Sequence, residues 1–143
     1  MAYRHAPLTG TSADYEQQLT AANGDPTDGD VSGAHITFAD PSADANIARV
    51  RRGPKKLLIK SRFTGSAKAT AEWVCRYWCY DAYTEKWHQT ALFTLVHQDA
   101  GTATKGGMAI VDNDPNASHG YIEVVSGVAA NQVLEVTVVA QEW

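Results

Sequence analysis

Four oxygen-bearing side chains late in the sequence have the spacing of a calcium-binding loop. Asp112, Asp114, Asn116 and Glu123 occupy positions 1, 3, 5 and 12 of a segment that begins at Asp112, and oxygens at these positions bind Ca²⁺ in EF-hand loops. Position 6, where such a loop needs glycine, is Ala117. Asp, Asn and Pro also build ordinary tight turns. We therefore expect a turn without a bound metal, and keep calcium binding as the alternative.

The two cysteines, Cys75 and Cys79, could in principle form a disulfide or bind a metal. On a strand they would share one face, about 13 Å apart, whereas a disulfide needs Cα atoms within about 7 Å. Zinc and redox sites use other spacings, and no second Cys or His pair completes a site. We therefore expect both residues to be buried structural thiols.

Positive charge is concentrated between residues 34 and 66, which hold seven basic and two acidic residues. The segments before and after this belt are both acidic. Nucleic-acid sites usually combine basic clusters with stacking aromatic rings, but the aromatic residues of this chain lie elsewhere. We expect no nucleic-acid partner. We expect the basic cluster to lie in a solvated turn or to contact an acidic neighbouring copy of the chain. Its members are Arg49, Arg51, Arg52 and Lys55.

Tryptophan and tyrosine are dense between residues 73 and 87. On a strand, Trp73 and Tyr77 share the face of Cys75, which predicts that they lie in the core. Trp78 and Tyr80 point to the opposite face, where aromatic rings could stack on a sugar or contact a protein. We favour a protein interface for this pair, with a carbohydrate site as the alternative.

Motifs of catalysis, membrane insertion and secretion are missing from the sequence. It lacks the common nucleophile, metalloprotease, phosphate-loop and dinucleotide patterns, and its five histidines have no metal-ligand spacing. No apolar run approaches the ~20 residues that span a bilayer, and the first residues lack an apolar signal segment. We expect a non-enzymatic protein without a cofactor or a membrane partner, made and retained in a cytoplasm.

Residues 1–33 are polar and rich in small side chains, which predicts an extended N-terminal arm. The arm contains at most one short helix, from Ser12 to Ala22, in which Tyr15 and Leu19 lie one turn apart. These two side chains are the arm's candidates for contact with a partner. The remaining residues, 34–143, are expected to form the folded domain.

From residue 34 onward, apolar and polar residues alternate with the period of a strand. The clearest case is the segment 55–63, where Leu57 and Ile59 alternate with Lys56 and Lys60. About eight short strands without βαβ alternation predict an all-β domain, an antiparallel β-sandwich that is jelly-roll-like, or else a closed barrel. The expected strands are 36–38, 45–50, 55–63, 67–80, 87–97, 108–111, 121–125 and 132–142. Between them we expect a hairpin turn at 81–86, a loop at 99–107 and a turn at 112–120.

Three features together carry a resemblance to a known group of proteins: the arm Met1 to Gly33, the hairpin from Tyr80 to Trp87, and the turns at Gly106-Gly107 and Gly120 before a β-rich C-terminus. In these features the chain resembles the small accessory virion proteins of tailed bacteriophages. That group includes the capsid decoration (cement) proteins and small head or tail fibre domains. The resemblance implies a protein of the virion, made in the host cytoplasm. It would form a homo-oligomer, most often a trimer, and bind the major capsid protein or another virion component.

Two functional hypotheses follow. The first is a non-enzymatic cement protein that stabilises a capsid lattice through multivalent protein–protein contacts. The second is a carbohydrate- or receptor-binding β-sandwich module. The residues expected at the interface are Arg49, Arg51, Arg52, Lys55, Trp78, Tyr80, Tyr15 and Leu19.

Overall fold

The computed structural model describes residues 16–19, 23–34, 36–38, 53–65, 70–100, 103–126 and 132–142. Within these ranges the chain is all-β, without a helix. Its strands are β1 (Glu16–Leu19), β2 (Ile36–Thr37), β3 (Lys56–Gly65), β4 (Thr70–Asp81), β5 (Lys86–Ala100), β6 (Ala103–Lys105), β7 (Gly107–Asp112), β8 (His119–Ser126) and β9 (Gln132–Glu142).

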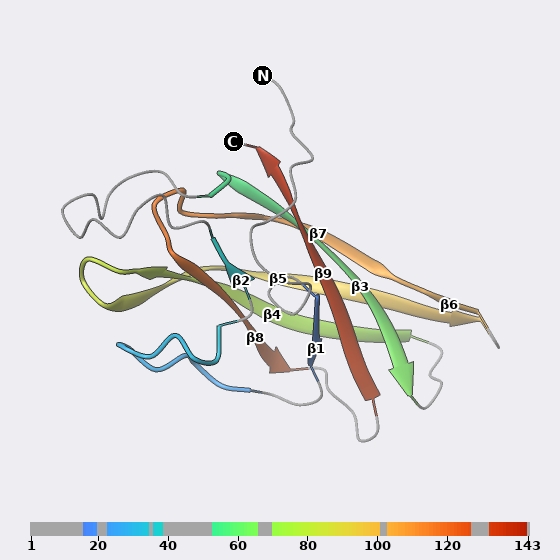
Figure 1. The fold of residues 1–143 in the computed structure, drawn as a ribbon. Coiled ribbons are helices and arrows are strands. Elements are labelled where there is room, and N and C mark those ends of the chain that lie inside the picture. The colour runs from blue at the N-terminus through green and yellow to red at the C-terminus, as the bar shows by residue number, and fades with distance from the viewer. Residues whose placement is uncertain are drawn as a thin grey trace.

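The strands form two antiparallel sheets. Sheet A has the order β1-β9-β3-β7, and sheet B has the order β2-β8-β4-β5-β6. In Figure 1, β3 and β9 of sheet A cross over β4 and β5 of sheet B. Most successive strands therefore alternate between the sheets, and only the β4–β5 and β5–β6 connections join neighbours within one sheet.

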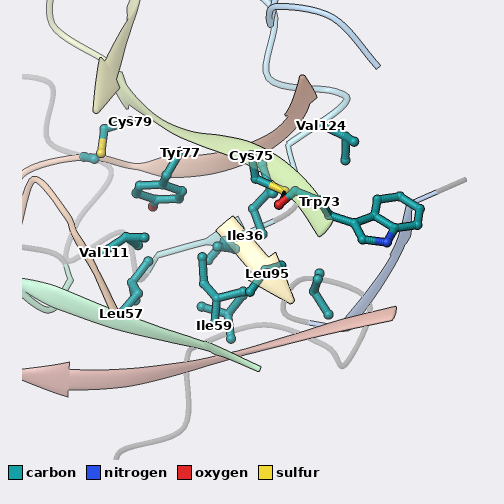
Figure 2. Close-up of a cluster of buried hydrophobic side chains, with 14 of the residues drawn as sticks. Ile36, Leu57, Ile59, Trp73, Cys75, Tyr77, Cys79, Leu95, Val111 and Val124 are labelled. Carbon is teal, nitrogen blue, oxygen red and sulfur yellow. Dashed lines mark hydrogen bonds between the residues drawn. The ribbon is translucent and has the colours of Figure 1, made fainter. Parts of the chain in front are cut away.

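One hydrophobic core lies between the two sheets. Leu57 and Ile59 extend into it from β3, and they lie against Ile36 and Leu95 of sheet B (Figure 2). Burying a large apolar side chain contributes about 1.5–3 kcal/mol, so this shared core is the main source of cohesion between the sheets. The other fully buried large side chains include Trp73, Tyr77, Ile122, Val124 and Val136.

The alternating pattern of the sequence identified the core faces correctly. In β4, Trp73, Cys75 and Tyr77 are buried as predicted. In β9, Val136 and Val138 are buried while Thr137 is exposed. The predicted core faces are correct because each strand presents one face to the shared core. The predicted strand 45–50 lies outside the described residues.

The predicted helix at residues 12–22 is wrong where the structure describes it. Glu16–Leu19 is a strand, and it pairs antiparallel with residues 134–137 of β9. A helix this short has little stability of its own, whereas β9 offers backbone hydrogen bonds along an otherwise open edge. Tertiary pairing therefore overrides the local helical pattern. Of the two arm candidates, Leu19 ends this strand and Tyr15 lies outside the described residues.

The expected loop at 99–107 is instead largely paired. Strand β5 continues to Ala100 and pairs with β6 in sheet B, whereas β7, one residue after β6, pairs with β3 in sheet A. The chain thus changes sheets at Gly106–Gly107. A Cβ on Gly107 would lie 3.0 Å from the Val96 carbonyl oxygen and 3.1 Å from the Ser61 hydroxyl oxygen. Because glycine has no Cβ, it fits at the point where the chain crosses from sheet B to sheet A.

A second close approach, between Gly120 and Tyr77, provides a test of the core. A Cβ on Gly120 would lie 2.9 Å from Cε2 of the buried Tyr77 ring. We predict that Gly120→Ala lowers the free energy of unfolding by about 1–3 kcal/mol, the range for overpacking, measured by urea unfolding. The control Gly33→Ala adds a Cβ with nothing within 4 Å and should change stability by less than about 0.5 kcal/mol. Equal stability of the two variants would contradict the packing described here.

Candidate functional site

The turn after β7 is built around the buried side chain of Asn113. Its Oδ1 accepts a hydrogen bond from the Tyr77 hydroxyl at 2.8 Å, and a weaker one from the Cys79 thiol at 3.5 Å. Its Nδ2 donates to the Pro54 carbonyl at 2.7 Å. The Asn113 amide thus joins the beginning of β3, the middle of β4 and the β7–β8 turn, which come from both sheets.

The structure does not bring the four candidate calcium ligands together. Asp112 is the last residue of β7 in sheet A, and its carboxylate forms an ion pair of 3.0 Å with Lys56. Glu123 is instead buried on sheet B, beside Arg76. Asp114 accepts a hydrogen bond from the backbone N–H of Asn116 at 2.9 Å, as in an ordinary Asx turn. No group of three or more metal-binding His, Cys, Asp or Glu side chains occurs among the described residues.

Both cysteines are buried and unpaired with each other, as expected from their spacing. Burial, with a smaller contribution from the charge of Glu123, raises the pKa of Cys75 to about 12. Burial also raises the pKa of Cys79 to about 11, although the hydrogen bond from the backbone N–H of Asp114 acts in the opposite direction. At neutral pH both are therefore protonated thiols, which are poor nucleophiles.

Only one member of the predicted basic cluster lies in the described part of the chain. Lys55 is exposed just before β3. Arg49, Arg51 and Arg52 lie outside the described residues, so their role at an interface stays a prediction. Lys56, next to Lys55, is engaged with Asp112.

Tyr80, expected at an interface, is instead buried inside the molecule. It is 7% exposed and packs with Trp87 and Tyr121 in a second buried cluster, which is aromatic and lies on the outer side of sheet B. Its ring centroid lies 5.0 Å from that of Trp87, and the Trp87 centroid lies 6.0 Å from that of Tyr121. Trp78 packs beside this cluster and stays partly exposed, so it remains available for contact with a partner.

Residues 23–34, here called the covering segment, close over this aromatic cluster. The Trp87 indole N–H donates to the carbonyls of Thr27 and Asp30 at 3.1 and 3.2 Å. The Asp28 carboxylate accepts a hydrogen bond from the Trp87 backbone N–H at 3.0 Å and pairs with Lys86 at 3.1 Å. These two contacts lower the pKa of Asp28. The segment is therefore held by specific polar contacts as well as by packing.

Asn23, at the start of the covering segment, also satisfies the edge of β8. Its Nδ2 donates to the Ile122 carbonyl at 2.9 Å, and its Oδ1 accepts from the Val124 N–H at 2.7 Å. The side-chain amide thus takes the place of a neighbouring strand's peptide group. This arrangement blocks further strand addition at an edge that β2 covers only at His119 and Gly120.

Glu123 is a buried carboxylate on the outer side of sheet B. It pairs with Arg76 at 3.3 Å and accepts a hydrogen bond from the Trp78 indole at 3.4 Å. Burial and the neighbouring Asp25 carboxyl raise its pKa. No sequence pattern indicates this pairing, because Arg76 and Glu123 become neighbours only through the β4–β8 register.

Exposed apolar side chains gather on the outer faces of both sheets. On sheet B they form the surface that we call the β5 surface, made of Leu92, Val96 and Val125. Leu92 stands opposite Arg76 in the β4–β5 register, and Arg76 stands opposite Glu123 in the β4–β8 register. Arg76 is half-buried, and an arginine beside exposed apolar side chains is common in protein interfaces.

The second exposed surface lies on the outer face of sheet A. Met108 and Ile110 of β7 are 66% and 61% exposed. In the sheet register, Ile110 stands opposite the half-buried Leu58, which stands opposite the half-buried Val139. We call these four side chains the β7 surface. It lies on the opposite sheet from the β5 surface, so the molecule presents apolar area on two sides.

We predict that the Asn113 amide and the Tyr77 hydroxyl stabilise the fold as one unit. Asn113→Ala leaves a buried hydroxyl and a carbonyl without partners and should lower the free energy of unfolding by about 2–4 kcal/mol. Tyr77→Phe should cost about 1 kcal/mol, and the double variant should cost less than the sum of the two. Urea unfolding followed by tryptophan fluorescence measures all three.

The matched control for Asn113 is Asn116→Ala in the same turn, where the side chain is exposed. This change should alter stability by less than about 0.5 kcal/mol. Strictly additive effects of Asn113→Ala and Tyr77→Phe would show that the two groups act independently, against the geometry described above.

We also predict that neither thiol reacts in the folded protein. At pH 8, a disulfide reagent such as DTNB should label none of the cysteines in native protein and both in urea. Because the folded pKa values of Cys75 and Cys79, about 12 and about 11, exceed the ordinary 9.0, the unfolded chain loses these protons first as pH rises. The thiols' contribution to stability is complete below pH 9 and is lost as pH rises to the folded values.

Above pH 9 each thiol should therefore steepen the fall in stability by up to about 1.4 kcal/mol per pH unit. The variant Cys75→Ala/Cys79→Ala should show a shallower decline than the wild type between pH 9 and 11. Rapid labelling of the native protein, or identical pH slopes, would contradict the burial of these thiols.

No protein-family model matches the chain, and neither a curated protein nor a solved structure matches it. No helix in the described ranges is long and apolar enough to cross a membrane. The functional inference therefore rests on the chain's own geometry. The leading features of that geometry are the β5 and β7 surfaces and the polar contacts that hold the covering segment on sheet B.

Proposed function

We propose that the domain is a jelly roll, the more specific form of its two-sheet architecture. In a jelly roll, strands one, eight, three and six form one sheet, and strands two, seven, four and five form the other. If β6 and β7 are counted as one strand that changes sheets at Gly106, the orders β1-β9-β3-β7 and β2-β8-β4-β5 follow the same scheme. This count gives eight strands, but they differ from the eight expected, since β1 was expected as part of a helix and the expected strand 45–50 lies outside the described residues. Jelly rolls occur in viral capsid and lectin domains, which are the two classes at issue.

The chain, on this proposal, is a non-enzymatic virion structural protein, a capsid decoration or cement protein that binds the capsid lattice through several contacts at once. The observation that carries the proposal is the pair of apolar surfaces on opposite sheets. A protein that joins others needs at least two such contacts, and multiple weak contacts on a lattice add up to tight binding. The β5 surface, made of Leu92, Val96 and Val125, with Leu92 opposite Arg76, is the proposed lattice contact.

The fold accounts for the raised pKa values of three titratable groups. Glu123 is paired with Arg76 and buried, and both thiols are protonated within the core. Groups with raised pKa values often mark catalytic sites. Here the fold itself explains each shift, since burial is the largest cause for all three.

The alternative, a carbohydrate- or receptor-binding module, has less structural support. Sugar stacking needs open aromatic faces. Tyr80, Trp87 and Tyr121 are instead buried beside the covering segment. Trp78 and Tyr83 keep exposed area, so binding to glycans remains the outcome that would favour this alternative.

The test begins with particles. We expect particles purified from a lysate of the source organism to contain this chain at a constant ratio to their most abundant capsid protein, measured by quantitative mass spectrometry. Particles made without the chain should bind the purified protein saturably. Absence from the particles, together with specific binding on a glycan array, would refute the cement role and favour the alternative.

A pair of variants locates the lattice contact. Leu92→Glu places a charge in the β5 surface and should weaken particle binding at least about tenfold, which corresponds to about 1.4 kcal/mol. Tyr83→Glu makes the same kind of change at an exposed site in the β4–β5 turn and should bind like the wild type. Equal effects of the two variants would argue against the β5 surface.

A further inference from the structure

Two carboxyl groups meet where the covering segment begins. The side-chain amide of Asn23 contacts β8 at the Ile122 carbonyl, at 2.9 Å, and at the Val124 N–H, at 2.7 Å. Glu123, the residue between these two, forms a hydrogen bond with the carboxyl of Asp25. Because Glu123 is only 4% exposed, little water can take the place of this partner.

A hydrogen bond between two carboxyl groups requires a proton. An ionised carboxylate only accepts hydrogen bonds, so one of the two groups must stay protonated for the contact between Asp25 and Glu123 to exist. When both groups ionise, repulsion between like charges replaces the bond. Burial, together with the hydrogen bond to Asp25, raises the pKa of Glu123, which favours Glu123 as the group that carries the proton.

The other groups around Glu123 offset this repulsion only in part. From β4, Arg76 lies 3.3 Å away and the Trp78 indole N–H donates at 3.4 Å, and both contacts favour the ionised carboxylate. Two further titratable groups of the described chain interact with its charge, Cys75 of β4 and Tyr121 of β8. Burial raises the pKa of both, so they are neutral at neutral pH. Arg76 is thus the one cation among these neighbours.

We propose that the proton shared by Asp25 and Glu123 holds the first part of the covering segment on β8, so that the segment loosens there as the pH rises. The contact is complete below the ordinary glutamic acid pKa of 4.5. Because the pKa of Glu123 is raised while the segment is in place, this contribution is lost as the pH rises through the raised value. Loosening uncovers the Val124 N–H, a backbone donor at the edge of β8 to which an extended segment of a partner can bind.

The other end of the covering segment responds in a different pH range. Asp28 accepts a hydrogen bond from the Trp87 N–H at 3.0 Å and pairs with Lys86, and these contacts hold the pKa of Asp28 below the ordinary 3.8. The contribution of Asp28 is therefore complete above pH 3.8 and is lost as the pH falls through the lowered value. Between weakly acidic and neutral pH, we expect the change at the Asn23 end.

Amide hydrogen exchange of the full chain, followed residue by residue by NMR, tests the proposal. The Val124 and Trp87 amides report on the two ends, because each donates to a side chain of the covering segment. Between about pH 4.5 and about pH 8, after correction for the intrinsic exchange rate, the protection of Val124 should fall while that of Trp87 stays constant. A wild type in which Val124 keeps its protection, or in which both amides lose it equally, would overturn the proposal.

Three variants identify the groups involved. Asp25→Asn and Glu123→Gln each supply an amide that donates to the remaining carboxylate without a titrating proton, so both should keep Val124 protected up to pH 8. Asp25 is exposed, so its variant decides the matter if Glu123→Gln impairs folding. The control Asp30→Asn changes a carboxylate that accepts from the Ser32 N–H at 2.8 Å, and it should respond to pH like the wild type. A loss of protection that persists in Asp25→Asn, or that disappears in Asp30→Asn, would overturn the role of the carboxyl pair.

Discussion

A single buried amide, that of Asn113, ties together three parts of the chain that are distant in sequence. It binds the carbonyl before β3 and the Tyr77 hydroxyl in β4, while its own residue begins the turn that leads to β8. A buried hydroxyl or carbonyl without a partner costs about 1–3 kcal/mol, so each of these groups constrains the others. The position of the Tyr77 ring in turn leaves no room for a side chain at Gly120. The geometry at this end of the core therefore follows from one side chain.

Several polar groups on the outer side of sheet B have their partners within the molecule. The covering segment supplies carbonyls to the Trp87 indole, and Asn23 completes the edge of β8. The outer faces of the sheets also expose large apolar side chains, at Leu92, Val96, Met108 and Ile110, among polar ones such as Lys60 and Thr94. Because such side chains offer contact area without demanding defined hydrogen-bond partners, their exposure on two sides suits a protein whose work is to hold other proteins together.

Sequence reasoning recovered the parts of the fold that depend on local alternation. Leu57 and Ile59, and likewise Trp73, Cys75 and Tyr77, were assigned to the core because one face of each strand is buried. Sequence reasoning failed where contacts between residues far apart in the sequence determine the structure. Residues 16–19 have a helical spacing but pair with β9. Tyr80 was expected on an open face, but residues of the covering segment pack against its cluster. The sequence around Asn113 is that of an ordinary turn. No local pattern distinguishes a buried turn asparagine from an exposed one, since its partners come from other strands.

The place of β9 between β1 and β3 has a consequence for biosynthesis. A ribosome delivers β9 after every other strand of the described fold, yet β9 is the neighbour that both β1 and β3 require in sheet A. Sheet A cannot close until β9 has been made, and folding must wait for pairings of long sequence separation, which form slowly. During that interval the apolar faces of β3 and β4 lack their cover. Before β9 emerges, the nascent chain exposes apolar surface of the kind that chaperones bind.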